Sequence, residues 1–186
     1  MRVEQFEIPD LKLIHPAVFE DPRGYFFESY NYERFCEAGI SDHFLQDNQS
    51  LSQTGVLRGL HFQTGNFAQS KLVRVIKGSV LDVAVDIRKG SPTYGKHLAV
   101  ELNEKNKLML YVPVGFAHGF LTLSDDTIFS YKCGNVYNKA SEMGIMWNDP
   151  DLQIDWKIEN PLLSEKDKVN LIFRDFNSPF TYQPEN

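Results

Sequence analysis

Short strand-like runs that alternate with turn residues constrain the fold of this 186-residue chain more than any other feature. Evenly spaced short strands are typical of a β-barrel or a β-sandwich. The aromatic content of 13% favours the same class, because aromatic side chains suit pleated, half-buried surfaces. We therefore predict a mainly β fold. The turn signals between Val56 and Lys132 are Lys77-Gly78, Lys89-Gly90-Ser91-Pro92, Glu104-Lys105-Asn106 and Ser124-Asp125-Asp126.

Length and charge set further limits. Residues 1–186 are predicted to form a single domain, since the sequence shows no linker and its 42% hydrophobic content is enough for one core. A net charge of −6 argues against nucleic acid or an anionic membrane as a partner, because both demand a basic face. Cys36 and Cys133 are predicted to be free thiols. Without a signal-like start or a long apolar run, the chain is predicted to be cytoplasmic.

The N-terminal region, Met1 to Tyr30, is predicted to contain two strands joined by the turn Asp21-Pro22-Arg23-Gly24. Arg23, Phe26 and Glu28 lie near this turn. They form either a ligand clamp or a polar turn beside an exposed aromatic ring.

A short helix is predicted from Asn31 to Gly39, with an N-cap residue at its start and a glycine at its end. Phe44 to Ser52 is predicted to be a loop, either with amide donors for a nucleobase or simply solvated. Met143 to Trp156 is predicted to be a loop with Trp147 and Trp156 as packing anchors. An irregular tail is expected at 176–186.

The stretch from Val56 to Arg74 concentrates unlike polar groups among apolar residues. Its histidine, lysine and two arginines could perform acid/base chemistry on an anionic substrate. The alternative is a core histidine with cations that protect a sheet edge. Strict strand alternation would place Arg58 and His61 on opposite faces, so Gly59 between them is a candidate bulge that would re-aim one of them.

Two acidic positions have both structural and chemical interpretations. Asp82 shares a face with Ala84 and Asp86 in a predicted strand, and this face is either solvent or a polar barrel interior. Asp167 follows Ser164 by three residues in a predicted helical turn, which is typical of helix capping.

The segment Pro113 to Phe120 matches P-x-G-x-x-H, the second signature of the cupin β-barrel family. A metal-binding cupin also needs a His-x-His pair, because a transition metal requires three or four converging ligands. Here the comparable position is His61-Phe62-Gln63. We therefore expect no metal, and we expect His118 to be a hydrogen-bonding residue of the site.

Taken together, these segments resemble the dTDP-4-dehydrorhamnose 3,5-epimerase family over most of the chain. The resemblance implies a cupin-type jelly-roll β-barrel with short peripheral helices, whose N-terminal strands (about 1–30) are exchanged in a homodimer. The matching segments are Asp21-Pro22-Arg23-Gly24-x-Phe26-x-Glu28, Gln46-Asp47-Asn48, Arg58 to Gln63, Gln69-x-Lys71-Leu72-Val73-Arg74, Asp82 to Arg88, Gly115 to Phe120, Tyr131-Lys132-Cys133, Glu142 and Ser164-x-Lys166-Asp167.

The activity that this resemblance implies is epimerisation of dTDP-4-dehydro-6-deoxy-D-glucose at C3 and C5, without a metal or a cofactor, in the route to dTDP-L-rhamnose. His61 is then the base, assisted by Asp167, Tyr131 is the acid, and Lys71 lies near the sugar. The implied substrate-binding residues are Arg23, Phe26, Glu28, Gln46, Asp47, Asn48, Arg58, Lys71, Asp82, His118, Glu142 and Lys166. Arg23 and Glu28 are expected to reach across the dimer.

Alternatives to this function remain. Within the family, a relative could invert only C3 or shift the ketone along the ring. A catalytically silent sugar-nucleotide-binding barrel would be expected to lack His61 or Tyr131, and a metal-dependent cupin oxygenase would need the missing second histidine. The chain departs from the family at Thr64 to Ala68, where the family often has prolines, and this concerns the rigidity of that loop.

Overall fold

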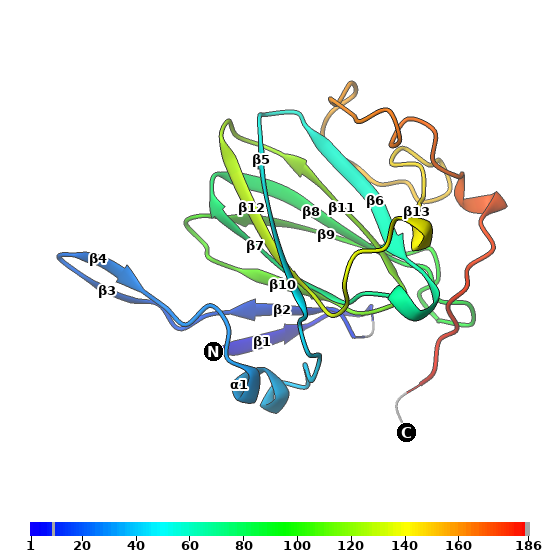
Figure 1. Cartoon of the computed structure of the whole chain (residues 1–186). Helices are drawn as coiled ribbons and strands as arrows, with labels where there is room; N and C mark the ends of the chain where they lie inside the picture. Colours follow the sequence, from blue (N-terminus) through cyan, green and yellow to red (C-terminus); the bar gives the residue numbers. More distant parts are fainter. Residues whose placement is uncertain (9, 185–186) are drawn as a thin grey trace.

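Two antiparallel β-sheets face each other in the computed structural model, which describes residues 1–8 and 10–184 (Figure 1). The six-stranded sheet consists, in spatial order, of β1 (Arg2–Gln5), β2 (Lys12–His15), β10 (Met109–Val112), β7 (Lys71–Lys77), β12 (Thr127–Cys133) and β5 (Gln46–Ser52). The five-stranded sheet consists of β13 (Glu142–Gly144), β6 (Leu57–Gln63), β11 (Phe116–Thr122), β8 (Ser79–Asp86) and β9 (His97–Asn103). These ladders confirm the predicted mainly β, cupin-like architecture, although they do not close into one barrel within the described residues.

The main hydrophobic core lies between the two sheets. Val73 from the six-stranded sheet packs with Ala84 and Phe120 from the five-stranded sheet, and none of them is more than 5% exposed. Asp82 and Asp86 point to the same side as Ala84, so their shared face is the interior and not solvent. Both carboxylates are fully buried.

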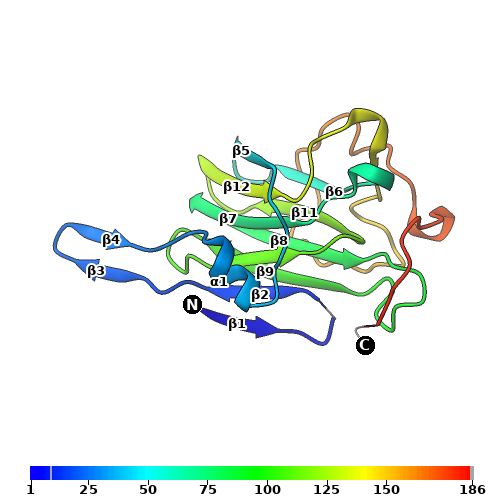
Figure 2. The ribbon, with the colours of Figure 1, turned by 60° about the horizontal axis from the view of Figure 1, so that its bottom comes forward.

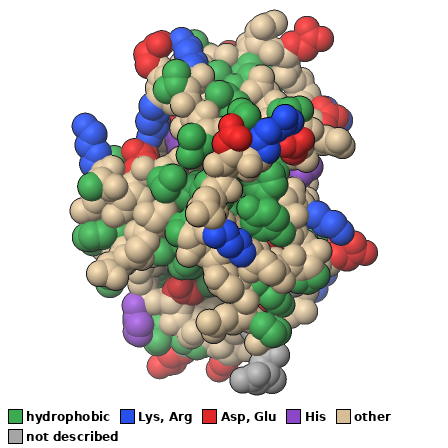
Figure 3. Space-filling view, turned by 90° about the vertical axis from the view of Figure 1, so that its right-hand side faces the viewer, with side chains coloured by type: hydrophobic (Ala, Val, Ile, Leu, Met, Phe, Trp, Pro, Cys, Tyr) green, Lys and Arg blue, Asp and Glu red, His purple; other side chains and the backbone are tan. Residues whose placement is uncertain are grey.

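The outer faces of the sheets are covered by different segments. The C-terminal segment packs Trp156 and Phe176 onto the five-stranded sheet, while Trp147 contributes from a half-buried position, so both tryptophans are packing residues as predicted. Charged side chains of both signs lie among hydrophobic ones on this side of the molecule (Figure 3). Helix α1 (Tyr32–Glu37) packs Phe35 on the outer face of the six-stranded sheet.

Helix α1 agrees closely with its prediction. The side chain of Asn31 caps its first turn by accepting a hydrogen bond from the Arg34 amide, and Gly39 follows the end with a φ of +74°. The other helices are single 3-10 turns, which agree with the expected short peripheral helices: η1 (Gly65–Phe67), η2 (Lys139–Ser141) and η3 (Phe173–Asp175).

The N-terminal region contains four strands instead of the predicted two. β1 and β2 extend the six-stranded sheet, whereas β3 (Phe19–Asp21) and β4 (Gly24–Phe26) pair only with each other around the predicted turn. This hairpin projects from the body in both ribbon views (Figures 1 and 2). The predicted number of strands was too low because each of these four strands is only three or four residues long.

The loop predicted for Phe44 to Ser52 was wrong, since Gln46–Ser52 forms strand β5 and pairs with β12 along its whole length. Its even-numbered residues are half-buried or buried and its odd-numbered ones exposed. Because the inward side chains are polar, the strand lacks the apolar alternation that identifies most strands. A shorter strand, β13, likewise interrupts the loop predicted from Met143.

The bulge predicted at Gly59 is present in β6. In the pairing with β11, His61 lies opposite His118 and Arg58 lies opposite Phe120, so two residues of β6 face Gly119 alone. Gly59 has a φ of +140°, and an added Cβ would lie 2.5 Å from the Cα of Gly119. Only glycine fits this conformation and this close approach.

Residues 176–184 contain no helix or extended strand, as predicted, and 185–186 lie outside the described residues. Cys36 and Cys133 are both free thiols, also as predicted. Among the described residues, no helix is long and apolar enough to span a membrane.

Candidate active site

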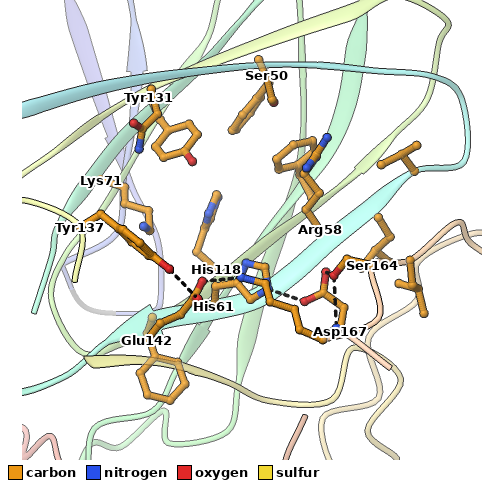
Figure 4. Close-up of a pocket in the computed structure, with 18 of the residues that line it drawn as sticks. Ser50, Arg58, His61, Lys71, His118, Tyr131, Tyr137, Glu142, Ser164 and Asp167 are labelled. Atoms are coloured by element: carbon orange, nitrogen blue, oxygen red, sulfur yellow. Dashed lines mark hydrogen bonds and ion pairs between the residues drawn. The ribbon is translucent and has the colours of Figure 1, made fainter. Parts of the chain in front are cut away.

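A cavity of about 480 Å³ opens between the two sheets at one end of the fold (Figure 4). The six-stranded sheet contributes polar side chains from β5, β7 and β12, and the five-stranded sheet contributes others from β6, β11 and β13. The turn at Ser164 to Asp167 completes one wall. Nine predicted site residues line it: Asn48, Arg58, His61, Lys71, His118, Tyr131 and Glu142, together with Lys166 and Asp167 from the turn.

His61 and Asp167 form the closest polar contact in the cavity. His61 Nε2 lies 2.5 Å from Asp167 Oδ1, and the Asp167 side chain is only 2% exposed. Burial works to raise the pKa of Asp167, but the hydrogen bond and charge of His61, followed by Ser164, hold it below its usual value. An ionised Asp167 accepts the Nε2 proton, which leaves Nδ1 as the basic nitrogen of His61.

Asp167 also makes the hydrogen bonds expected of a capping residue, although the segment is a turn and not a helix. Ser164 Oγ donates to Asp167 Oδ2 at 2.8 Å, and the Asp167 amide donates to Ser164 Oγ at 3.3 Å. The same turn therefore aims the other carboxylate oxygen at His61, so the structural and the chemical roles of Asp167 coexist.

Tyr131 faces His61 across the open space, from the opposite sheet (Figure 4). Burial raises the pKa of the Tyr131 phenol, with the charge of Arg58 and the Asn48 amide acting the other way. The phenol is therefore fully protonated at neutral pH. Tyr131 still packs against Phe129, so its predicted packing role is real but partial.

Lys71 lies beside Tyr131, with its Nζ 5.6 Å from the centre of the tyrosine ring. Its Nζ also donates to Gln69 Oε1 at 3.4 Å. Burial lowers the pKa of Lys71, which makes its ammonium a stronger hydrogen-bond donor to a nearby oxygen.

His118 is held by Asp82, whose two carboxylate oxygens each lie 3.0 Å from His118 Nε2. Both residues are buried, and only His118 lines the cavity. Asp82 thus lies behind the cavity wall and fixes the orientation of a residue that is in it.

Arg58 lies on the same side of β6 as His61 because of the bulge. Its guanidinium donates to Ser52 Oγ at 3.2 and 3.3 Å, and within the described residues it has no carboxylate partner. Ser50, on strand β5 of the facing sheet, has a buried hydroxyl without a hydrogen-bond partner. A guanidinium without a carboxylate partner and an unpaired hydroxyl, both lining one cavity, are suited to an anionic, oxygen-rich ligand.

The opening of the cavity is lined by Tyr137, Glu142 and Lys166. Tyr137 donates its hydroxyl proton to Glu142 Oε2 at 3.1 Å, and Lys166 Nζ lies 2.5 Å from Glu142 Oε1. Burial works to raise the pKa of Glu142, but Lys166 and then Tyr137 hold it below the usual value.

Some predicted site residues do not line the cavity. Arg23, Phe26 and Glu28 are on or beside the projecting hairpin, where Arg23 pairs with Asp21. Asp47 points outward and pairs with Lys132 at 3.0 Å. Gln46 lies just behind the wall, where its side chain contacts Asn48 and the backbone of Tyr137.

The sequence interpretation missed several lining residues. Ser50, Phe120 and Phe129 project inward from predicted or unpredicted strands, and Tyr137 comes from the loop after β12. Only Tyr137 had a usable signal, since it is an aromatic residue among the polar loop residues Asn135 and Asn138.

Metal-ligand geometry is not found in the part of the chain that the structure describes: no group of three His, Cys, Asp or Glu side chains is arranged to hold an ion. His61 and His118 lie opposite each other in the β6–β11 pairing, but each is held by its own carboxylate. The expectation that no metal or cofactor takes part stays a prediction.

Comparisons with known proteins agree on one family. The family model described as dTDP-4-dehydrorhamnose 3,5-epimerase matches residues 5–175. The dTDP-4-dehydrorhamnose 3,5-epimerase of Shigella flexneri is 54% identical over 168 residues, covering 90% of this chain and 93% of the relative.

Solved structures lead to the same family. The crystal structure of dTDP-4-dehydrorhamnose 3,5-epimerase from Elizabethkingia anophelis superposes with a TM-score of 0.91 at 52% identity, covering 96% of this chain and 99% of that one. A Legionella pneumophila dTDP-6-deoxy-D-glucose-3,5-epimerase in complex with dTDP-4-keto-L-rhamnose gives a TM-score of 0.94 at 45% identity, covering 98% and 99%.

Proposed function

Because this chain belongs to the dTDP-4-dehydrorhamnose 3,5-epimerase family, we propose that His61 and Tyr131 are the base and the acid of its reaction. The enzyme is an isomerase that converts dTDP-4-dehydro-6-deoxy-D-glucose to dTDP-4-dehydro-L-rhamnose by epimerisation at C3 and C5, in dTDP-L-rhamnose biosynthesis. The observation that supports the two assignments is their placement on facing sheets with the cavity between them (Figure 4).

Proton removal starts the reaction. A C–H bond next to the C4 ketone is acidic because its electron pair moves onto the ketone oxygen as the proton leaves. His61 takes this proton through Nδ1, and the resulting imidazolium is stabilised by Asp167 at Nε2.

The enolate oxygen then carries the developing charge. Lys71 lines the cavity with its Nζ 5.6 Å from the centre of the Tyr131 ring, and we assign it the stabilisation of that oxygen. His118, held rigid by Asp82, supports the sugar from the five-stranded sheet.

Inversion requires a proton from the opposite face of the sugar ring. Tyr131 donates its phenolic proton to the carbon, whose bond is re-formed as the enolate returns to the ketone. Solvent then reprotonates Tyr131 and deprotonates His61. The same cycle then takes place at the second carbon, once that carbon lies between His61 and Tyr131. Inversion at C3 and at C5 therefore uses the same base and the same acid.

Deuterium incorporation tests this assignment. The purified protein is incubated with dTDP-4-dehydro-6-deoxy-D-glucose in D₂O, and the product is analysed by mass spectrometry and NMR. Two deuterium atoms and inversion at both C3 and C5 are expected. A product inverted at C3 alone, or a shifted ketone, would instead assign the chain to the related reactions named above.

Arg58 is proposed to bind the diphosphate, and this gives a testable prediction. Arg58→Ala should weaken the binding of dTDP by about 1.5–3 kcal/mol, the usual range for one charge-assisted hydrogen bond, while turnover at saturating substrate falls much less. Calorimetry with dTDP measures the first effect, and steady-state kinetics the second.

Arg174→Ala is the matched control, because Arg174 is an exposed arginine that pairs with Asp151 at 3.4 Å, away from the cavity. Equal dTDP affinity in the Arg58 variant and the control would remove Arg58 from the binding site.

A homodimer is the further part of the proposal, supported by the projecting β3–β4 hairpin. Its six residues are all exposed, and Phe19 and Phe26 are 65% and 69% exposed. Exposed apolar side chains on a two-stranded ribbon are typical of a surface that another chain covers. A second copy would then place Arg23, Phe26 and Glu28 at the cavity that this chain builds. The Asp21–Arg23 pair is an exposed one that a phosphate can replace at little cost.

Phe26→Glu is predicted to shift the protein toward a monomer and to weaken dTDP binding. A buried carboxylate at the interface would cost several kcal/mol without a partner. Analytical ultracentrifugation gives the mass. Leu123→Glu, at an exposed position in the β11–β12 turn, should leave the mass unchanged. A Phe26→Glu protein with wild-type mass would contradict the exchange of the N-terminal strands.

The remaining assignments follow the same reasoning. Residues 1–186 are proposed to work as one domain, with both sheets needed to build the cavity. Free thiols at Cys36 and Cys133 support a reducing compartment, and we assign the enzyme to the cytoplasm.

A further inference from the structure

Gln63 is a buried polar residue for which the mechanism above has no use. It lies two residues after His61 on β6 and is 5% exposed. Its amide group donates to Phe67 O at 3.0 Å and to Val136 O at 3.2 Å, and its carbonyl oxygen accepts from Asn138 N at 2.6 Å. One side chain thus joins three separate backbone positions.

Two of these positions lie on either side of Tyr137. Val136 and Asn138 are its direct chain neighbours, so Gln63 holds the backbone both before and after the tyrosine. Gln46 completes this arrangement, because its Oε1 accepts from the Tyr137 amide at 2.9 Å. The short loop at the cavity opening is therefore fixed by glutamine side chains that come from two different sheets.

The ring of Tyr137 is held at its far end as well. Its hydroxyl donates to Glu142. The position of Glu142 is fixed relative to β6, because Glu142 lies opposite Gln63 in the β6–β13 pairing. Tyr137 is 52% exposed, so packing alone does not fix it. Without the hydrogen bonds from Gln63 and Gln46, the loop that carries Tyr137 would have to become ordered when substrate binds. The entropy cost of that ordering would lower the affinity for substrate.

The same glutamine restrains the neighbouring loop. Phe67 belongs to the segment Thr64 to Ala68. This chain has no proline in that segment to restrict the backbone conformation. Gln63 bonds Phe67 O, and Asn135 bonds Asn66 O at 2.8 Å. Hydrogen bonds from the body of the protein thereby supply a restraint on a loop that contains Gly65.

We propose that Gln63 is a positioning residue that fixes Tyr137 as a preformed wall of the substrate cavity and thereby sets the affinity for the nucleotide sugar. Gln63 itself lines the cavity, but its side-chain hydrogen bonds go to the backbone of Phe67, Val136 and Asn138, and in this proposal it acts through Tyr137. The proposal rests on substrate occupying the cavity as described above.

A double-mutant cycle tests this. Gln63→Met keeps the length of the side chain and removes its donors and acceptor, and Tyr137→Ala removes the ring. The dissociation constant of dTDP is measured by calorimetry for both single variants and for the double variant. KM and kcat are measured for the full substrate. Gln53→Met is the matched control, since Gln53 is an exposed glutamine that bonds Asp126.

The expected results are specific. Gln63→Met should raise the dTDP dissociation constant and KM by about tenfold, the effect of about one lost hydrogen bond, with kcat changed by less than about threefold. In the Tyr137→Ala background, the same substitution should add less than about twofold, because the ring it positions is gone. Gln53→Met should change neither value.

Equal effects of Gln63→Met in both backgrounds would overturn the proposal, and so would a loss of kcat at unchanged KM. If Gln63→Met does not fold, Gln63→Glu retains the acceptor for Asn138 and is measured in the same cycle with the same criteria. Turnover by the unsubstituted enzyme separately tests whether the cavity binds the substrate at all.

Discussion

Replacing His61 with alanine is expected to reduce solvent deuterium exchange at the sugar carbons by at least about 10²-fold, the usual contribution of a general base. The fold should remain intact, because His61 is half-buried and its main partner is Asp167. The affinity for dTDP should also remain, because Arg58 and the cavity opening are unchanged. Exchange is measured by mass spectrometry in D₂O, and affinity by calorimetry.

His43→Ala is the control for His61, because His43 is an exposed histidine that stacks on Tyr32. Asp167→Asn provides a second comparison: it keeps the size of the side chain but removes the charge that stabilises the imidazolium. Near-wild-type exchange in His61→Ala would show that another group takes the proton, and the base assignment would fail.

Tyr131→Phe is expected to separate proton exchange from inversion. If His61 both removes and returns the proton, the sugar regains its original configuration. A second donor on the other face is therefore needed for a new product. The variant should keep part of the exchange through His61, while the formation of inverted product falls by a further factor of about 10².

The Tyr131→Phe variant also tests how much Tyr131 contributes to stability by packing. Only an oxygen atom is lost, and the ring contacts with Phe129 persist, so the melting temperature should change little. NMR of the product reports inversion at C3 and C5, and Tyr94→Phe serves as the control at a half-exposed tyrosine that packs on Phe173. Inversion of both centres at the wild-type rate would make Tyr131 a core residue and leave solvent as the first alternative donor.

The strand ladder from Val56 to Lys132 was predictable because its turns are marked by glycine, proline and acidic residues. Strand β5 was not, because its inward side chains, Asn48 and Ser50 among them, are polar. A strand that faces a polar cavity loses the apolar alternation by which strands are identified. A strand that lines the cavity was therefore hard to predict.

The site shows a similar division. His61, Lys71 and Tyr131 were found because they are titratable groups within strand-like runs or match the family pattern. Tyr137 was missed, since its importance depends on a loop position that only the hydrogen bonds of Gln46 and Gln63 define. Contacts between segments far apart in the chain leave no local signal in one sequence.

The bulge at Gly59 has a consequence for engineering this cavity. The spacing between Arg58 and His61, the proposed phosphate-binding arginine and the proposed base, is set by main-chain geometry, because two residues of β6 are accommodated against Gly119 alone. Substitutions of other side chains leave this main-chain spacing in place. Any larger residue at Gly59 would collide with the backbone of Gly119. A designer who wants to admit a shorter or longer diphospho-sugar should therefore leave this strand untouched and vary the opposite wall, where β5 presents small polar side chains that can be exchanged without moving the main chain.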